Sequence, residues 1–343
     1  MSELLADHTT LRLGGPAREW VRAESEQALI DAVAEADAAG VPVLVLGGGS
    51  NLVVGDAGFD GRVVEVATRG VTPDVDDAEA VACGGVLVTV AAGERWDALV
   101  AQAVTRGWAG VEALAGIPGS VGATPVQNVG AYGQEVAQTI ASVRVFDRVL
   151  RGVRTFAAAE CDFAYRHSRF KADPGRHVVL SVTFQLRRGT LGEPIRYAEL
   201  ARALGVEVGG RVDLGEVRDA VLALRRGKGM VLDPDDHDTW SAGSFFTNPI
   251  VAPEAVPDGA PAFAQPDGGV KTSAAWLIEH AGFGKGHGAG PARLSTKHVL
   301  ALTNRGDASA DDLLALAREV RDGVRARYGI ELVPEPVLVG CDL

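Results

Sequence analysis

Residues 116–133 read GIPGSVGATPVQNVGAYG, and this stretch is the most informative about the fold. Glycines recur along it, interleaved with amide and hydroxyl side chains. Glycine lets a backbone approach a flat or phosphorylated ligand closely, and Gln127 and Asn128 offer donors and acceptors to the edge of a heterocycle. The pattern therefore indicates a ligand-binding loop. The alternative is an Ω-loop that is merely rich in glycine.

A second glycine-rich segment, GGGSN at residues 47–51, directly follows an apolar run at 43–46 that is typical of a buried strand. Successive backbone N–H groups in such a loop can cradle an anion such as pyrophosphate. The third glycine of the Rossmann fingerprint is missing, and residues 52–54 indicate a strand rather than a helix. An ordinary tight turn explains this segment alone equally well. Together, the two loops favour a dinucleotide bound without a Rossmann fold.

The composition describes a folded, acidic protein with a surplus of glycine. Glycine accounts for 43 of the 343 residues, against an average of about 7%. Lys and Arg number 33 against 45 Asp and Glu, which gives a net charge of −12. A field of that sign repels phosphate backbones and anionic membrane surfaces, so neither nucleic acid nor a membrane is an expected partner.

Cysteine usage and the N-terminal residues favour the cytoplasm. The three cysteines form no C-x-x-C pair, so no zinc or redox motif is expected and no metal site is predicted. Residues 1–10 lack the basic and apolar regions of a signal peptide. No run of about 18 apolar residues indicates a membrane span. We expect a soluble cytoplasmic protein.

The first 190 or so residues are predicted to be α+β, with more strands than helices. Ser25 is typical of a helix N-cap, and Gly40 and Gly107 are typical of helix ends. Strands are expected at 43–46, 63–67, 80–83, 87–91, 140–146 and 177–186, and helices at 25–40 and 96–105.

The rest of the chain is predicted to contain more helix, which places a seam near residue 190. Ser309 and Asp312 form the capping pattern of a long helix, and Pro334 and Pro336 argue against a central position for the last strand. Helices are expected at 197–204, 214–226 and 272–282, a surface loop or linker at 251–270, and strands at 298–303 and 330–339.

Three side chains are candidates for chemistry, each with an ordinary alternative. Arg166, in the segment YRHSRFK, could polarise a carboxylate or enolate, although a surface ion pair explains this segment better. Ser244, in AGSFFTNP, could donate a proton to a strongly basic carbon or simply cap a strand end. Glu335, between two prolines, fits a general acid, although an edge-strand Glu usually faces solvent. They lie far apart in the sequence, so the residues alone do not bring them together.

The chain resembles the UDP-N-acetylenolpyruvoylglucosamine reductases, flavoenzymes of peptidoglycan precursor synthesis. The resemblance extends from residue 9 to residue 340, and the long glycine-rich segment and the SFF-x-NP segment are highly specific together. The matching stretches read VLGGGSNLVV, GVEALAGIPGSVGATPVQNVGAYGQEV, CDFAYRHSRFK, RRGKGMVLDP, AGSFFTNP, QPDGGVKTSAAWLIEHAG and GIELVPEPVLVG.

The resemblance implies a fold and a reaction. It implies an FAD-binding lobe of the vanillyl-alcohol-oxidase type, with two α+β subdomains, at 1–190, and an α+β substrate-binding domain at 191–343 whose last strand brings Glu335 to the active site. NADPH reduces non-covalently bound FAD, flavin N5 gives hydride to C3 of the enolpyruvyl group, and UDP-N-acetylglucosamine-enolpyruvate becomes UDP-N-acetylmuramate. Ser244 protonates C2, while Arg166 and Glu335 stabilise the enolate. The alternatives are a related FAD-dependent alcohol or sugar oxidase and a non-catalytic flavin or nucleotide-sugar sensor.

The resemblance also implies binding residues and a monomeric enzyme. Tyr197 matches the substrate-covering tyrosine of the family branch with the longer third domain. Pro336 stands where the family usually has Val, and His167 where Asp is common. The implied FAD-binding residues are Gly47, Gly48, Gly49, Ser50, Asn51, Pro118, Gly119, Ser120, Val121, Gly122, Gln127, Gly130, Ala131, Tyr132 and Gly133, and the implied substrate-binding residues are Tyr165, Tyr197, Lys228, Asn248 and Lys271.

Overall fold

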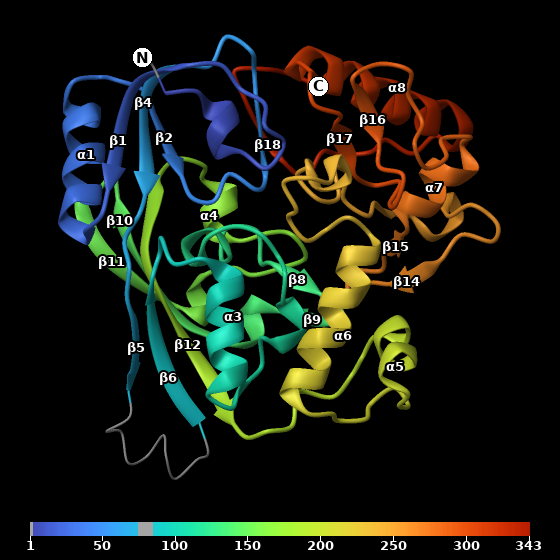
Figure 1. Ribbon diagram of the computed structural model, residues 1–343, viewed down its shortest axis with the longest axis horizontal. Coiled ribbons are helices and arrows are strands. Elements are labelled where there is room, and N and C mark those ends of the chain that lie inside the picture. The colour runs from blue at the N-terminus through green and yellow to red at the C-terminus, as the bar shows by residue number, and fades with distance from the viewer. Residues whose placement is uncertain (1–2, 75–84) are drawn as a thin grey trace. The chain divides into compact units, whose positions relative to one another are not determined.

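The computed structural model describes residues 3–74 and 85–343, which form two compact units (Figure 1). The large-sheet unit comprises Arg18–Gly48 and Asp60–Arg226, and the C-terminal unit comprises Met1–Ala17, Gly49–Phe59 and Gly227–Leu343. Residues 191–226 thus pack with the large-sheet unit, beyond the seam expected near residue 190. Compactness does not show which residues bind which ligand, so the assignment of 1–190 to FAD and 191–343 to substrate stays a prediction.

The large-sheet unit is built on a six-stranded antiparallel sheet. Its strand order is β11–β10–β12–β6–β5, with β7 paired to β12. The strands expected at 87–91, 140–146 and 177–186 are confirmed as members of this sheet, whereas the one expected at 80–83 lies outside the described residues. The strands are β5 (Val71–Asp74), β6 (Gly85–Ala91), β7 (Trp108–Ala109), β10 (Ile140–Asp147), β11 (Gly152–Ala157) and β12 (His177–Arg188).

Helix α1 (Glu26–Ala38) joins this sheet to a smaller one with the order β1–β4–β2. The Oγ of Ser25 accepts a hydrogen bond from the N–H of Ala28, which confirms the predicted N-cap. Leu29 and Val33 then pack in one buried cluster with residues of β4, β10 and β12. The remaining elements are β1 (Ala17–Ala23), β2 (Val43–Leu46), β4 (Phe59–Val66), α3 (Trp96–Thr105), α4 (Arg169–Ala172), α5 (Ala198–Leu204) and α6 (Leu214–Gly227).

The C-terminal unit packs two helices over short strands. The long helix α8 begins at the predicted Ser309–Asp312 capping box and ends at Gly329, whose φ of +69° is left-handed. Its residues Leu313, Ala317, Val320 and Val324 are buried, and the helix shares one core with α7 and with Phe245 and Phe246. The elements are β3 (Leu52–Val54), β13 (Ile250–Val251), β14 (Ala262–Ala264), β15 (Val270–Thr272), α7 (Ala274–His280), β16 (Ala292–Leu294), β17 (Leu302–Asn304), α8 (Ala310–Tyr328) and β18 (Val337–Val339).

Three expectations for this unit need correction. Residues 251–270, expected to be a loop, contribute to the sheet β13–β15–β14, whose strands of two or three residues are too short to show a period. The strand expected at 298–303 is shortened to β17. The strand expected at 330–339 is shortened to β18, because prolines lack the N–H that a ladder needs. The edge position predicted for it is confirmed, since β18 pairs with β3 alone in a two-stranded sheet.

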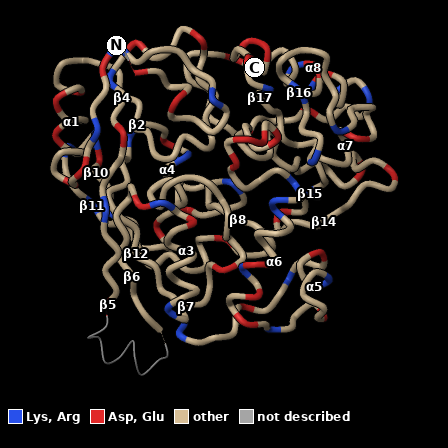
Figure 2. Tube along the Cα trace, viewed as in Figure 1, with Lys and Arg blue, Asp and Glu red and all other residues tan. Residues whose placement is uncertain are grey.

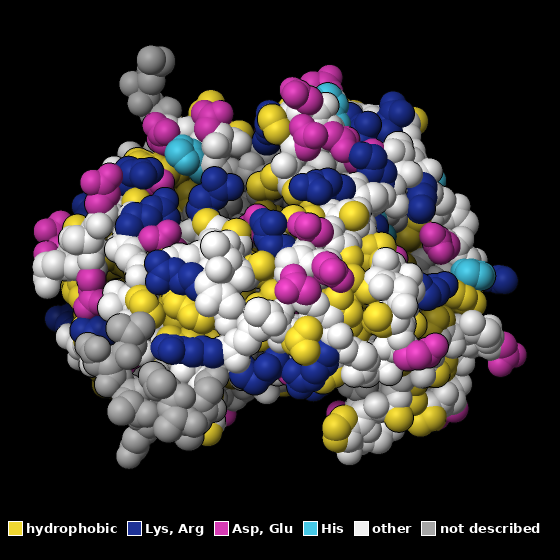
Figure 3. Space-filling view, turned by 60° about the horizontal axis from the view of Figure 1, so that its bottom comes forward, with side chains coloured by type: hydrophobic (Ala, Val, Ile, Leu, Met, Phe, Trp, Pro, Cys, Tyr) yellow, Lys and Arg dark blue, Asp and Glu magenta, His cyan; other side chains and the backbone are white. Residues whose placement is uncertain are grey.

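Positively and negatively charged residues are both spread along the trace (Figure 2), and their side chains are interspersed on the face shown in Figure 3. The excess of acidic residues is therefore distributed along the chain rather than collected in one tail. Within 3–74 and 85–343, no helix is both long enough and apolar enough to span a membrane.

Candidate functional site

The two glycine-rich loops meet backbone to backbone in the large-sheet unit. A Cβ added to Gly47 would lie 2.5 Å from the Oγ of Ser120, and one added to Gly48 would lie 2.6 Å from the Cα of Gly119. At Gly48 the neighbouring atom belongs to the backbone, so only glycine fits there. The structure thus brings together the two segments that the sequence singled out for a dinucleotide.

The rest of the GGGSN loop belongs to the C-terminal unit. Gly49 has a φ of +59°, and a Cβ there would lie 1.9 Å from the carbonyl oxygen of His8. Asn51 donates from Nδ2 to the carbonyl oxygen of Glu335 at 3.3 Å, and its own carbonyl accepts from the N–H of Val337 at 3.0 Å. Asn51 therefore supports the segment that carries Glu335, in addition to the role in FAD binding that stays predicted for it.

Two backbone N–H groups of the Pro118–Gly133 loop form hydrogen bonds within the protein. The N–H groups of Val121 and Gly122 donate to the carbonyls of Glu94 and Ala92, both at 2.8 Å. The side chain of Val121 is fully buried. These two residues shape the loop rather than offer N–H groups to a ligand.

The expectation for the Asn128 side chain is wrong. Asn128 is only 1% exposed. Its Nδ2 donates to Glu135 and to the carbonyl of Ala164, and its Oδ1 accepts from the N–H of Ala137. The amide is engaged inside the protein, so it does not offer an edge to a heterocycle. The role predicted for Gln127 stays a prediction.

Glu112 is an organising residue that the sequence analysis missed. This buried carboxylate accepts from the N–H of Gly110 at 2.7 Å, from Nε2 of Gln134 at 2.9 Å and from the N–H of Glu193 at 2.7 Å. Gln134 belongs to the hairpin of β8 (Gly130–Ala131) and β9 (Gln134–Glu135), so Glu112 ties that hairpin to two other segments. The available signal was one acidic residue inside the apolar run 108–115.

The side chain of Arg166 contacts the glycine-rich loop at residues 116–133. Its Nη2 donates to the carbonyl of Gly130 at 3.1 Å, and its Nη1 donates to the carbonyl of Asn128 at 3.5 Å. Its guanidinium carbon lies 5.4 Å from the centre of the Tyr165 ring. The structure therefore brings the predicted enolate-stabilising residue to the predicted cofactor loop.

Tyr132 of this loop lies near a second tyrosine and interacts with a buried arginine. The ring of Tyr132 meets the half-exposed ring of Tyr197 edge to face, with centroids 5.8 Å apart. Burial raises the pKa of Tyr132 to about 12, against the opposing effect of Arg225. Burial also lowers the pKa of Arg225 to about 10. The sequence analysis missed Arg225, although it continues the buried i, i+4 row of Val217 and Val221 on α6.

Ser244 and Glu335 lie on neighbouring extended segments of the C-terminal unit. Phe245, which follows Ser244, donates its N–H to the carbonyl of Leu300 at 2.7 Å and accepts at its own carbonyl from the N–H of Glu335 at 2.8 Å. Phe246 forms a bridge with Pro334. The rings of Phe245 and Phe246 are fully buried, which anchors the Ser244 segment in the core. The fold thus brings these two candidates together although 90 residues separate them in the sequence.

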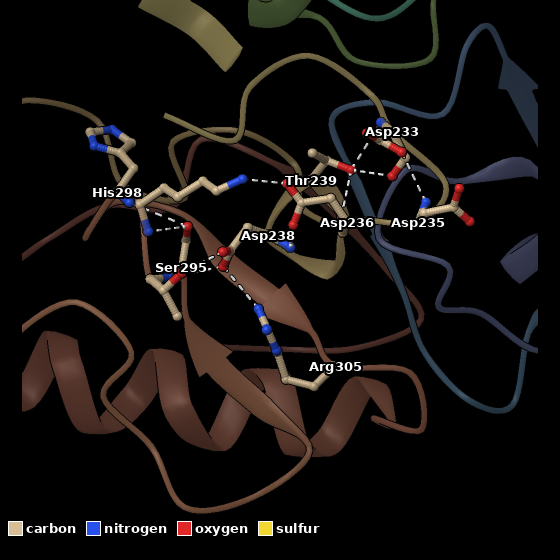
Figure 4. Close-up of polar contacts among 10 residues, drawn as sticks. Asp233, Asp235, Asp236, Asp238, Thr239, Ser295, His298 and Arg305 are labelled. Carbon is tan, nitrogen blue, oxygen red and sulfur yellow. Dashed lines mark hydrogen bonds and ion pairs between the residues drawn. The ribbon is translucent and has the colours of Figure 1, made fainter. Parts of the chain in front are cut away.

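The segment that leads to Ser244 is anchored by a buried carboxylate (Figure 4). Asp238 accepts from the N–H and Oγ1 of Thr296, at 2.9 and 2.5 Å, and from Nη1 of Arg305 at 2.8 Å. Burial alone would raise the pKa of Asp238, but these hydrogen bonds hold it below its ordinary value. Nearby, Asp236 accepts from Nζ of Lys297 at 2.5 Å.

The predicted substrate-binding residues are divided between the two units. Tyr165 and Tyr197 belong to the large-sheet unit. Lys228, Asn248 and Lys271 belong to the C-terminal unit, where the Oδ1 of Asn248 accepts from the N–H of Ala274 at the start of α7 and Lys271 lies in β15. Among the described residues, no group of three or more His, Cys, Asp or Glu is arranged to hold a metal ion.

Comparisons with known proteins find matches over nearly the whole chain. A family model described as the C-terminal domain of UDP-N-acetylenolpyruvoylglucosamine reductase matches residues 233–339, and one described as an FAD binding domain matches residues 17–149. The chain is 63% identical over 342 residues to the UDP-N-acetylenolpyruvoylglucosamine reductase of Cutibacterium acnes, which covers 99% of this chain and 90% of that protein. It is 50% identical over 363 residues to that of Mycobacterium avium, covering 99% and 95%.

Among solved structures, the chain is similar to the crystal structure of UDP-N-acetylenolpyruvylglucosamine reductase from Thermus caldophilus. The TM-score is 0.67 at 28% identity, covering 99% of this chain and 98% of that one. Together with the family models, this likeness confirms the predicted α+β FAD-binding lobe followed by an α+β C-terminal domain.

Proposed function

Because the chain belongs to the UDP-N-acetylenolpyruvoylglucosamine reductase family, we propose that it reduces the enolpyruvyl ether of UDP-N-acetylglucosamine-enolpyruvate to UDP-N-acetylmuramate. The full-length identity to named relatives carries this proposal. FAD is the cofactor and NADPH the reductant. We also propose that the enzyme acts as a monomer in the cytoplasm, where NADPH and nucleotide sugars occur. The free thiols of Cys161 and Cys341 agree with a reducing compartment.

The residues present suit FAD. The two loops that the sequence singled out for FAD meet at Gly48 and Gly119 with no side chain between them, which supports a shared cofactor-binding surface. When bound, FAD supplies from N5 the hydride that C3 of the enolpyruvyl group receives, with NADPH as the source of electrons. The protein itself binds FAD and the substrate, stabilises the negative charge that develops on the substrate, and supplies the proton.

Arg166 and Glu335 handle the charge. Hydride addition at C3 leaves negative charge at C2 and on the adjoining carboxylate. The guanidinium of Arg166 offers charge-assisted donors that strengthen as this charge develops. A protonated Glu335 donates one further hydrogen bond. The backbone bonds of Arg166 to the glycine loop and of Glu335 to Phe245 support fixed positions for both.

Ser244 handles the proton. Its hydroxyl gives a proton to C2, which completes the lactyl ether. Serine is a weak acid, so this transfer works only because an enolate carbon is a strong base. The buried Phe245 and Phe246 support the role, since they hold the hydroxyl on a rigid segment rather than on a mobile loop.

The proposal is tested by following the flavin absorbance of the purified holoenzyme. NADPH should bleach the flavin band, and UDP-N-acetylglucosamine-enolpyruvate added without oxygen should restore it. Restoration by oxygen but not by the enolpyruvyl sugar would instead favour an oxidase. A flavin that NADPH does not bleach would contradict the reductase function outright.

A further inference from the structure

Asn128 is a buried amide inside the glycine-rich loop, with no direct part in the proposed chemistry. Its Nδ2 donates to Oε2 of Glu135 at 2.8 Å and to the carbonyl of Ala164 at 3.1 Å. Its Oδ1 accepts from the N–H of Ala137 at 3.1 Å. Both amide hydrogens and the amide oxygen are thus engaged, and the side chain connects the loop to the turn that carries Arg166.

The main chain around Asn128 also meets Arg166 directly. The carbonyls of Asn128 and Gly130 accept from the two Nη groups of Arg166. Ala164, which the Asn128 side chain holds, begins the turn, because Ala164 and His167 exchange both backbone hydrogen bonds at 3.1 Å. Asn128 therefore holds Arg166 at two points, through the start of its turn and through its guanidinium.

Backbone strain is concentrated at this contact. Among the described residues, six that are not glycine have a left-handed φ, and three of them, Asn128, Tyr132 and Arg166, lie here with φ of 48°, 50° and 51°. Such a conformation is strained for a residue other than glycine, although Asn tolerates it better than most. Strain of this kind persists only where surrounding contacts enforce it, and the side-chain bonds of Asn128 are contacts of that kind.

We propose that Asn128, with Glu135 as its acceptor, is a positioning residue that fixes the Arg166 guanidinium for the enolate. This inference rests on the role proposed above for Arg166. The carboxylate of Glu135 makes the bond to Asn128 charge-assisted. It also demands a donor at position 128, since an aspartate there would face the Glu135 carboxylate and the carbonyl of Ala164 with acceptors only.

The test compares Asn128→Asp with Glu135→Gln in the FAD-loaded enzyme. Asp matches Asn in shape and also tolerates the left-handed conformation, so the change removes donors and adds repulsion. We expect Asn128→Asp to slow flavin reoxidation by the enolpyruvyl sugar about tenfold or more, as for a misplaced catalytic group. Flavin content and flavin reduction by NADPH should stay within about twofold, well inside that effect. Glu135→Gln keeps an acceptor for Asn128 and should remain near wild type.

Two double variants separate positioning from a general structural effect. In Asn128→Asp/Glu135→Gln, the new amide can donate to the aspartate, so part of the lost reoxidation rate should return. In an Arg166→Ala background, Asn128→Asp should add less than about a twofold loss, because residues that act through one another are not additive. A full additional loss in that background would overturn the proposal, as would equal slowing of both half-reactions or loss of flavin.

Two further results need their own interpretation: an Asn128→Asp variant that does not fold, and an Arg166→Ala variant that reoxidises at the wild-type rate. If Asn128→Asp does not fold, Glu135→Ala, which removes the acceptor, replaces it against the Glu135→Gln control. Equal reoxidation rates for that pair would overturn the proposal. If Arg166→Ala itself leaves reoxidation unchanged, the role proposed for Arg166 fails, and the role of Asn128 fails with it. If only the role proposed for Asn128 is wrong, Arg166→Ala slows flavin reoxidation and Asn128→Asp does not, so the two failures can be distinguished.

Discussion

The glycine-rich loop of the large-sheet unit and the Ser244–Glu335 segments of the C-terminal unit are held in different ways. Asn128 in the loop and Glu112 just before it, both buried, bond through their side chains to backbone groups outside the loop. In the C-terminal unit, backbone groups bond to one another over a buried aromatic pair. Side chains thus connect the loop to neighbouring segments, whereas backbone groups hold the Ser244 and Glu335 segments to each other. Substitution of the connecting polar side chains should therefore disturb the loop, whereas substitution of Ser244 or Thr247 should leave the backbone pairing in place.

The largest expected effect is chemical and concerns the paired segments. Ser244→Ala should leave the fold and flavin reduction by NADPH unchanged, because the segment is held by its backbone and its neighbouring Phe side chains. Reoxidation by the enolpyruvyl sugar should fall by about 10²–10⁴-fold, the value of a positioned proton donor. Single-turnover flavin absorbance measures both steps separately.

Thr247→Val provides the matched control for Ser244→Ala. Thr247 lies on the same segment and its Oγ1 donates to the carbonyl of Val333 at 3.4 Å, so its loss removes a hydroxyl without removing the proposed donor. Its reoxidation rate should stay near wild type. A Ser244→Ala enzyme that reoxidises within about tenfold of wild type would exclude Ser244 as the donor.

The next effect concerns stability, through the segments that Glu112 joins beside the loop. Glu112→Gln puts an amide group where one carboxylate oxygen now accepts from a buried N–H, which should lower the free energy of unfolding by about 1–3 kcal/mol. Glu160→Gln is the control, because Glu160 is exposed and accepts only from the N–H of Ala157. It should change stability by less than about 0.5 kcal/mol. Urea unfolding measures both, and equal effects would show that these segments do not depend on the buried carboxylate.

A smaller effect should appear at the Arg166 backbone. Arg166→Gly and Arg166→Ala remove the same guanidinium, but only glycine adopts the observed φ of +51° without strain. The glycine variant should therefore be more stable than the alanine variant by about 1 kcal/mol. Both should lose reoxidation activity alike. Thermal unfolding compares the two, and an alanine variant at least as stable as the glycine variant would argue against strain at this turn.

Elements could be predicted from the sequence where a hydrophobic periodicity extends over several turns and a capping residue marks the end of a helix. The Ser25 and Ser309 caps and the buried rows of α1 and α8 follow from local rules, and all are present. The sheet β13–β15–β14 could not be predicted, since its strands are shorter than one readable period. At the site, residue chemistry pointed to Arg166, Ser244 and Glu335, but only the tertiary pairing of Phe245 with Glu335 joins the last two. The role of the Asn128 side chain could not be predicted, because the sequence does not show whether a polar side chain bonds to a ligand or to the protein's own backbone.

The smallest expected effect is a pH dependence that distinguishes buried polar groups in the two units. In the large-sheet unit, hydrogen bonds from Arg176 lower the pKa of Asp147 to about 2, while burial lowers the pKa of His177 below its ordinary 6.5. His177 therefore binds a proton less readily in the folded state than in the unfolded chain. Its contribution to stability is fully present above pH 6.5 and decreases as the pH falls below that value. The contribution of Asp147 is lost only in stronger acid, between about pH 4 and pH 2.

Removing His177 should isolate its part of this slope. Urea unfolding from pH 7.5 down to pH 5 should show a steady loss of stability in the wild type, and His177→Gln should flatten that loss because glutamine does not titrate. Asp238 in the C-terminal unit has a lowered pKa, so its carboxylate stays charged in this window in the folded state, as in the unfolded chain. Asp238→Asn should lower stability by a similar amount at pH 7.5 and pH 5. A slope unchanged by His177→Gln would show that the wild-type loss comes from other groups and that this buried imidazole does not couple the large-sheet unit to pH.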